Sequence, residues 1–283
     1  MTTRAVVLAR GLGTRMREPD PGAPLSREQH RAADAGLKAM MPVNGRPFLD
    51  YVLGSLAEAG LRDVALVVAP DHEMLRQHLA AAAPARLQVS FAVQETPLGT
   101  ADAVLAAETW TQGEPFLVMN ADNLYPVAAL RALAALDQPG FLAFDADDLV
   151  RTSNIPAGRV RAFALAVVDE DGYLASIVEK PAEVPPEGES HETSSPRVAS
   201  PFSRKQTYVS MNCWGFDARI FQACRDVPKS TRGEFELPEA VALAVARGMR
   251  IKAVPANGPV LDLSRRADAA DVARRLAGIV SWP

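Results

Sequence analysis

One stretch near the N-terminus combines the residue types that bind phosphate. It directly continues an apolar run at residues 5–9 and reads Leu8-Ala9-Arg10-Gly11-Leu12-Gly13-Thr14-Arg15-Met16. Glycines let a backbone come close to an anion, exposed N–H groups can point at it, and an arginine neutralises its charge. The stretch therefore predicts a phosphate-binding turn at the end of a buried strand. For an isolated Gly-x-Gly, a tight turn without a ligand is the alternative.

Two better-known glycine-rich motifs do not fit this spacing. A dinucleotide-binding fingerprint needs a third glycine three residues after the second and a helix that begins at once. Position 16 is Met16, and Pro19, Pro21 and Pro24 predict that no helix begins immediately. A P-loop needs Gly-Lys and then Ser or Thr after four intervening residues, and the sequence has no such run. The pattern Gly-x-Gly-Thr-Arg has to be interpreted with the rest of the chain.

Polar side chains follow other predicted strands at positions where a nucleotide site would need them. Lys38 could reach phosphate oxygens, and Asp122, at a strand end, is a natural Mg²⁺ ligand. Gln94 offers a paired donor and acceptor to a pyrimidine edge. Gly99 would let a base or ribose lie against the backbone, and Thr100 would cap the following helix.

Two more segments lie in the second half of the chain: Glu179-Lys180 ends a hairpin strand, and Asp262 lies near the C-terminus. Each candidate has a mundane alternative. Glu179 and Lys180 could form a weak surface pair, and Asp262 could cap the last helix. Asp122 alone could belong to a turn, and Gln94 could be a solvated strand end. We favour the joint interpretation because the strand ends of one sheet converge on one crevice.

The elements that would position these residues alternate through the first half. Apolar runs predict buried parallel strands at residues 5–9, 64–69, 87–93, 116–119 and 140–144. Apolar residues at helical spacing predict helices at residues 48–59, 73–83, 100–109 and 127–136. This alternation predicts an open parallel α/β sheet with ligands at the carboxyl ends of its strands.

The second half has a different pattern. Strands at residues 159–168 and 174–179 flank the hairpin turn Asp169-Glu170-Asp171-Gly172, and residues 181–206 predict a long mobile loop rich in Pro, Glu and Ser. We then expect a strand at 207–216, helices at 218–224 and 237–247, a strand at 251–254 and a final helix at 267–280. The sequence has no hexapeptide repeat, so we expect no C-terminal β-helix.

The bulk properties of the 283 residues fit a soluble globular protein: 48% are hydrophobic and 23% charged. A net charge of −4 gives no broad footprint for nucleic acid or an anionic membrane, so any phosphate would be held locally. The two cysteines, Cys213 and Cys224, are too few for a disulfide framework, and we expect them to be buried and inert. Without a signal segment or a run of membrane-spanning length, a cytoplasmic enzyme is expected.

Over residues 3–275 the chain resembles the sugar-phosphate nucleotidylyltransferases, which include glucose-1-phosphate thymidylyltransferases and uridylyltransferases. The motif at residues 11–15 carries the resemblance, supported by Lys38, the block from Gln94 to Thr100, Asp122, Glu179-Lys180, Asn212 and Asp262. The resemblance implies a Rossmann-like, mostly parallel open sheet with helices on both faces, of the nucleotide-diphospho-sugar transferase type, with a small hairpin and a helical sugar-binding part. It further implies a single domain, with an NTP-binding half at residues 1–145 and an acceptor-binding half at 146–283.

The resemblance also implies a role for each matched residue. Gly11, Gly13, Thr14 and Arg15 would cradle the triphosphate, and Leu8 and Ala9 would also bind the nucleotide. Lys38 would touch the phosphates of both substrates, and Gln94, Gly99 and Thr100 would recognise the base. Glu179, Lys180 and Asn212 would hold a phosphorylated small-molecule acceptor, with a sugar 1-phosphate expected. Asp122 and Asp262 would bracket Mg²⁺. Arg15, Lys38 and Asp122 would be the catalytic residues.

Three features depart from the family pattern. Arg10 stands where a small residue is usual, either as an extra phosphate contact or pointing away. Ala39 follows Lys38 in place of the usual proline. Residues 17–36 form a longer connection than usual, either a lid or a contact between subunits of a homo-oligomer, with Ser26 expected to cap a helix.

The expected reaction is Mg²⁺-dependent nucleotidyl transfer from an NTP to a sugar 1-phosphate. The block around Gln94 favours UTP or dTTP, with CTP as a further option. Two other functions stay open at this point. One is a glycosyltransferase of related fold, because Asn120-Ala121-Asp122 faintly resembles an Asp-x-Asp metal motif. The other is a regulatory homologue that binds nucleotide without turnover.

Overall fold

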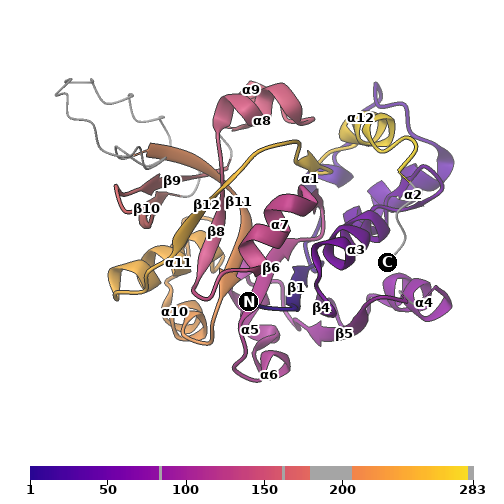
Figure 1. The fold of residues 1–283 in the computed structure, drawn as a ribbon. Coiled ribbons are helices and arrows are strands. Elements are labelled where there is room, and N and C mark those ends of the chain that lie inside the picture. Colours follow the sequence, from indigo (N-terminus) through magenta and orange to yellow (C-terminus); the bar gives the residue numbers. More distant parts are fainter. Residues whose placement is uncertain (83–84, 161–162, 179–205, 280–283) are drawn as a thin grey trace.

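The computed structural model describes residues 1–82, 85–160, 163–178 and 206–279. Its centre is a nine-stranded mixed sheet (Figure 1). Four parallel strands form one part of it, in the order β6 (Phe116–Asn120), β1 (Arg4–Leu8), β4 (Asp63–Val68) and β5 (Gln88–Val93). The chain places β4 and β5 on one side of β1 and later returns to place β6 on the other. Such a reversal of strand order leaves a crevice beyond the carboxyl ends of the strands.

The other strands extend the sheet beyond β6. The long strand β11 (Gln206–Phe216) lies antiparallel between β6 and β8 (Gly140–Phe144), and β12 (Lys252–Ala256) adds parallel to β8. The hairpin of β9 (Ala164–Val168) and β10 (Leu174–Val178) pairs with the first half of β11. The predicted mostly parallel α/β sheet with a small hairpin is confirmed, and the antiparallel strands β10 and β11 make it mixed.

Helices cover both faces of this sheet (Figure 1). Because side chains alternate along a strand, Ala5 and Val7 of β1 belong to the apolar core on one face and Val6 to the core on the other. The first core is closed by α3 (Phe48–Ala59) and α7 (Val127–Ala134). The second is closed by α5 (Thr100–Ala106), α10 (Ile220–Asp226) and α11 (Leu237–Ala246). Helices therefore pack on both faces of the sheet, and loops follow the carboxyl ends of its parallel strands.

Shorter elements complete the described chain. The helices are α1 (Thr14–Arg17), α2 (Arg27–Asp34), α4 (Glu73–Ala81), α6 (Glu108–Thr111), α8 (Ala146–Thr152), α9 (Ala157–Val160), α12 (Asp268–Arg275) and a 3₁₀ turn, η1 (Lys38–Met40). The strands are β2 (Pro42–Val43), β3 (Arg46–Pro47), β7 (Asn123–Leu124) and β13 (Leu261–Asp262). Of the helices in the described part of the chain, none has both the length and the apolar character needed to span a bilayer.

Several local predictions are confirmed. Ser26 caps α2, and its hydroxyl and the side chain of Gln29 each bond the other's backbone N–H. The turn at 169–172 has Gly172 at a φ of 79°, and its N–H donates to the carbonyl of Asp169. Cys213 and Cys224 are free and buried, and burial raises the pKa of Cys224 to about 12.

Other local predictions are wrong. A one-turn helix, α1, does begin directly after the glycine-rich turn; Pro19, which has no N–H, limits it to that turn. Residues 157–160 are helical, so the strand predicted from residue 159 begins only at Ala164. The helix predicted at 100–109 breaks at Ala107, and the last helix ends at Arg275. The mobile loop predicted at 181–206 lies, except for Gln206, outside the described residues.

Candidate active site

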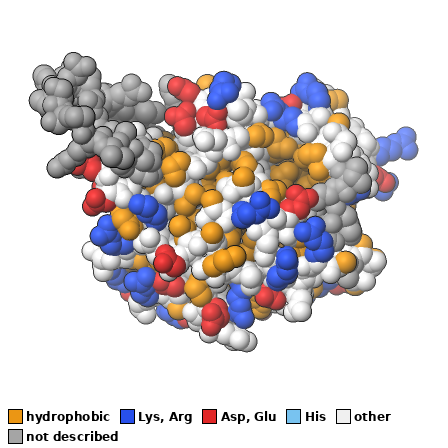
Figure 2. Space-filling view, in the orientation of Figure 1, with side chains coloured by type: hydrophobic (Ala, Val, Ile, Leu, Met, Phe, Trp, Pro, Cys, Tyr) orange, Lys and Arg blue, Asp and Glu red, His pale blue; other side chains and the backbone are white. Residues whose placement is uncertain are grey.

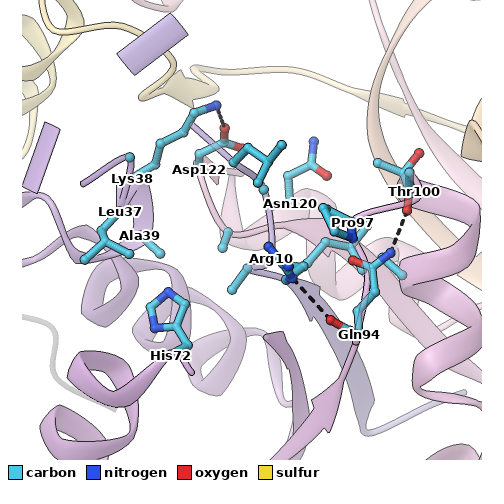
Figure 3. A pocket seen from close by; sticks show the side chains of 18 of the residues that line it. Arg10, Leu37, Lys38, Ala39, His72, Gln94, Pro97, Thr100, Asn120 and Asp122 are labelled. Atoms are coloured by element: carbon cyan, nitrogen blue, oxygen red, sulfur yellow. Dashed lines mark hydrogen bonds and ion pairs between the residues drawn. The ribbon is translucent and has the colours of Figure 1, made fainter. Parts of the chain in front are cut away.

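A pocket of about 290 Å³ opens at the carboxyl ends of the four parallel strands (Figure 3). The loops after β1, β4, β5 and β6 all contribute to its wall, as the strand order requires. Many of the predicted site residues line it, namely Leu8, Ala9, Gly11, Thr14, Lys38, Gln94, Gly99, Thr100 and Asp122. Gly13, Arg15, Asn212 and Asp262 do not line it, and Glu179 and Lys180 lie outside the described residues.

The two glycines of the turn after β1 have different surroundings. Gly11 is exposed, and a Cβ on it would meet nothing within 4 Å. Gly13 is buried at a φ of +63°, and a Cβ there would lie 2.3 Å from the carbonyl oxygen of Gly36. Gly11 therefore leaves room for a ligand, while Gly13 is required by the close approach of the chain's own backbone at Gly36.

Lys38 and Asp122 face each other at one side of this pocket. Lys38 begins η1, Asp122 follows β6, and the Lys38 Nζ lies 2.7 Å from the Asp122 Oδ2 (Figure 3). Burial lowers the pKa of Lys38, but the Asp122 carboxylate outweighs burial, so the pKa of Lys38 is raised. Arg15 does not line the pocket, but it is exposed and its charge also acts on Lys38. An anionic phosphate bound on the β6 side of the pocket would thus lie near two cations, Lys38 and Arg15.

Asp262 lies behind Asp122 in a buried network. Its backbone pairs with Asn123 in the β7–β13 ladder, and the N–H of Leu263 donates to the carbonyl of Asp122 at 2.9 Å. The Asp262 Oδ1 accepts hydrogen bonds from Asn123 and Ser264, whereas its buried Oδ2 makes no hydrogen bond with the described residues but lies 3.3 Å from the Arg159 Nη2, in an ion pair. Burial and the Asp122 carboxylate raise the pKa of Asp262.

This pair of carboxylates fits a hard divalent cation in its donor chemistry. Burial and the neighbouring Asp122 carboxylate disfavour the negative charge of Asp262; Arg159 offsets this in part, and a bound cation would offset it further. Among the described residues, no group of three or more His, Cys, Asp or Glu side chains is placed to hold a metal ion. A cation at the two aspartates would therefore need oxygens from a substrate or from water, as Mg²⁺ commonly does.

Gln94 is held in one orientation on the opposite side of the pocket. The side chain is 5% exposed, and its Nε2 donates to the carbonyl of Gly99 at 3.1 Å and to the Asp102 Oδ2 at 2.6 Å. Both partners can only accept, so the NH₂ end of the amide must face them. The prediction that Gln94 offers both a donor and an acceptor to a base is therefore wrong. Only the Oε1 of Gln94 is available to the pocket, and it accepts no hydrogen bond from the described residues.

Gly99 and Thr100 are fixed by a loop from the second half of the chain. Gly99 has a φ of +122°, and a Cβ on it would lie 2.5 Å from the carbonyl oxygen of Phe235. Phe235 donates to the carbonyl of Leu98 and accepts from the N–H of Ala101, both within 2.9 Å. The predicted cap by Thr100 is wrong, because the helix starts at Thr100 itself and the Thr100 hydroxyl accepts from the N–H of Leu237.

Asn212 lies on β11 at an irregularity in its pairing with β8. Its φ is 58°, and its Oδ1 accepts a hydrogen bond from the Trp214 Nε1 at 3.3 Å. Asparagine tolerates this left-handed conformation better than most residues. The carbonyl of neighbouring Met211 accepts a hydrogen bond from the hydroxyl of Tyr125, so the backbone beside Asn212 contacts the segment that follows β7.

Three pocket residues with titratable side chains were missed or left undecided in the sequence analysis. Arg10 lines the pocket, where its Nε donates to the backbone carbonyl of Gln94 at 3.2 Å (Figure 3). His72 follows β4 and also lines the pocket, although no motif in the sequence indicates a role for it. Glu234 reaches the pocket beside Phe235, from a loop without any sequence signal for a site.

The comparisons with known proteins agree with this geometry. Residues 4–265 match the family described as nucleotidyl transferase. The chain belongs to this family. A curated relative, a glucose-1-phosphate thymidylyltransferase of Streptomyces antibioticus, is 27% identical over 96% of the chain. The chain spans 65% of the length of that relative. A UTP–glucose-1-phosphate uridylyltransferase, AglF, of Haloferax volcanii is 26% identical over 96% of both chains.

Solved structures share the fold of this nucleotidyltransferase. A UDP-glucose pyrophosphorylase complexed with UDP-glucose superposes with a TM-score of 0.69 at 16% identity, covering 97% of this chain and 98% of that one. An inositol-1-phosphate CTP transferase from T. maritima has a TM-score of 0.67 at 16% identity, covering 99% and 98%. The resemblance to the sugar-phosphate nucleotidylyltransferases, the enzyme class and the α/β fold are thereby confirmed; the roles of individual residues stay predictions.

Proposed function

We propose that this nucleotidyltransferase transfers the nucleotidyl group of UTP or dTTP to a sugar 1-phosphate, giving an NDP-sugar and pyrophosphate. The observation that carries the proposal is one pocket with the Lys38–Asp122 pair on one side and the buried, oriented amide of Gln94 on the other. The first pair suits phosphates and the second suits a base. The thymidylyl- and uridylyltransferase relatives support the same substrate classes.

The chemistry is an in-line displacement at phosphorus. An anionic oxygen of the acceptor phosphate attacks the α-phosphorus of the NTP, a new P–O bond forms, and the bond to the bridging oxygen of pyrophosphate breaks. The acceptor is already an anion, so no protein nucleophile is required. The work of the chain is to position the two phosphates and to neutralise their charge, with Lys38 and Arg15 as the cations.

The nucleotide phosphates would lie on the turn after β1, at Leu8, Ala9, Gly11 and Thr14, with Gly13 shaping that turn against Gly36. Gly99 and Thr100 would border the base beside Gln94. Asp122 and Asp262 would hold Mg²⁺, which when bound supplies further neutralisation of phosphate charge. Glu179, Lys180 and Asn212 are proposed to hold the acceptor, as the family resemblance implies.

A substrate matrix tests this function. The common NTPs and dNTPs are combined with a panel of sugar 1-phosphates in the presence of Mg²⁺, and pyrophosphate release is measured. We expect turnover with UTP or dTTP and at least one hexose 1-phosphate. Tight NTP binding without pyrophosphate release in any combination would overturn the proposal in favour of a regulatory protein. Release of NDP from a nucleotide sugar, with no reaction of the NTPs, would instead establish a glycosyltransferase.

A further inference from the structure

The side chain of Arg10 leaves the glycine-rich turn on the side away from the phosphate cations. Asp122 follows β6, on one side of β1, whereas Gln94 follows β5, on the other side. The Arg10 Nε donates to the backbone carbonyl of Gln94, and its charge acts on His72, which follows β4. Arg10 therefore lies on the β4–β5 side of the pocket, next to the residue proposed to meet the base (Figure 3).

The guanidinium is anchored through one nitrogen only. Its remaining N–H groups make no hydrogen bond with the residues that the structure describes. Beside them, the 95%-buried Gln94 presents Oε1 as an acceptor with no donor in the described chain. The pocket wall therefore carries a free acceptor on the Gln94 side chain and free donors on Arg10, whose Nε is bonded to the Gln94 backbone.

We propose that Arg10 is a specificity residue that, together with Gln94, selects uracil or thymine as the base of the nucleotide. In this arrangement the Gln94 Oε1 accepts the N3–H of the base, and a free N–H of Arg10 donates to a carbonyl next to N3. The inference rests on the proposed function, since it assumes that the nucleotide occupies this pocket. The proposal gives a function to Arg10, which occupies a position where the family pattern has a small residue.

The hydrogen-bond pattern of the bases supports this choice. In uracil and thymine, N3–H is flanked by a carbonyl on each side, so an acceptor and a neighbouring donor are matched in either direction. In cytosine, N3 is itself an acceptor and would face the Gln94 Oε1, so the base would have to shift by one position. A buried acceptor without a donor is costly, so we expect the mismatch to lower the affinity for CTP.

Binding titrations without an acceptor sugar test the proposal, because no turnover occurs in them. Calorimetry compares UTP, dTTP, CTP and inorganic pyrophosphate on the wild type and on the variants Arg10→Ala and Arg10→Met. Arg76→Ala is the matched control, because this arginine stacks over Phe91, 4.5 Å from the ring centre, and does not line the pocket. Thermal melts report whether each variant folds.

We expect the wild type to prefer UTP and dTTP over CTP, and both Arg10 variants to bind UTP and dTTP about 10-fold more weakly. The affinity for CTP should fall less and that for pyrophosphate should not change. Equal losses for all three nucleotides together with pyrophosphate would make Arg10 a phosphate contact and overturn the proposal. An unchanged ratio of UTP to CTP affinity would overturn it as well.

The wild type alone supplies a test that needs no variant. In 2-thio-UTP and 4-thio-UTP, sulfur, a weak acceptor, replaces one carbonyl oxygen at a time. The proposal expects one of the two to bind several-fold more weakly than UTP, and equal binding of all three contradicts it. Base discrimination without pyrophosphate release in the substrate matrix would refute only the proposed reaction, whereas turnover without this discrimination would refute only the role of Arg10.

Discussion

The Lys38 Nζ lies 2.7 Å from the Asp122 Oδ2, and these residues are 84 positions apart in the sequence. Both side chains are about one-fifth exposed, at 22% and 20%, so the pair is open to the pocket and not sealed in the core. A pair of this kind can exchange partners when a phosphate and a cation arrive, because both side chains can be reached from the pocket. Lys38 would then turn to phosphate oxygens and Asp122 to the metal.

The first prediction concerns this pair. In Asp122→Asn we expect kcat to fall by about 100-fold or more, because the carboxylate that would hold Mg²⁺ beside the reacting phosphates is lost. The initial rate of pyrophosphate release measures this, and a melting curve shows whether the variant folds. Asp137→Asn at an exposed position is the control for the charge change and should keep full activity. An unchanged kcat in Asp122→Asn would rule out its role as a metal ligand.

The second prediction separates two roles of glycine. Gly99→Ala should destabilise the protein by more than about 2 kcal/mol, because it combines a disfavoured φ with a clash against the backbone of Phe235. Gly113→Ala, at a φ of +81° with nothing within 4 Å, carries only the backbone strain, about 1 kcal/mol. Urea denaturation of both variants measures the difference. Equal losses of stability would mean that Phe235 yields easily and does not fix the turn.

Much of the central fold could be predicted because its signals are local. The apolar run of β1 and its glycine-rich turn lie within one short segment, and the same holds for the hairpin turn at 169–172. The convergence of Lys38, Gln94 and Asp122 on one pocket also follows from parallel strands sharing one carboxyl edge.

The errors arise where contacts between distant segments decide the geometry. Phe235, more than one hundred residues away, dictates the conformation of Gly99, and α11 takes the Thr100 hydroxyl that a local rule assigns to its own helix. Asp102 takes the donor end of Gln94, so the side chain offers only an acceptor. No spacing within one segment predicts such partners.

The third prediction follows from that contact. In Asp102→Asn the partner of Gln94 can turn its own NH₂ toward the Gln94 Oε1, so only the carbonyl of Gly99 still favours the present orientation of the Gln94 amide, and the amide can present either end to the base. We expect the preference for UTP over CTP, measured as the ratio of their kcat/KM values, to fall several-fold. Glu95→Gln makes the same charge change at an exposed position one residue from Gln94 and should leave the ratio intact. A ratio unchanged in both variants would show that Asp102 does not orient Gln94.

The long connection between Arg15 and Lys38 is held from the far end of the chain by Arg266. Its guanidinium is buried and donates to the carbonyls of Met16, Arg17 and Glu18 at the end of α1, at 3.0, 3.2 and 2.9 Å. It also contacts Asp34 at 2.6 Å, at the end of α2. The last carbonyls of a helix have no partner within it, so one arginine satisfies those of α1 and ties them to α2.

The fourth prediction is that Arg266→Ala destabilises the protein by about 2–4 kcal/mol, because several buried carbonyls lose their donor at once. Asp34 is 69% exposed, so Asp34→Ala should cost less than about 1 kcal/mol, which separates the ion pair from the carbonyl bonds. Arg265→Ala, at the exposed neighbouring position, is the matched control and should be neutral. Because α1 directly continues the turn proposed to bind phosphate, Arg266→Ala should also raise KM for the NTP several-fold at a temperature where the variant stays folded. A loss of stability with KM unchanged would mean that Arg266 anchors the connection without positioning the turn.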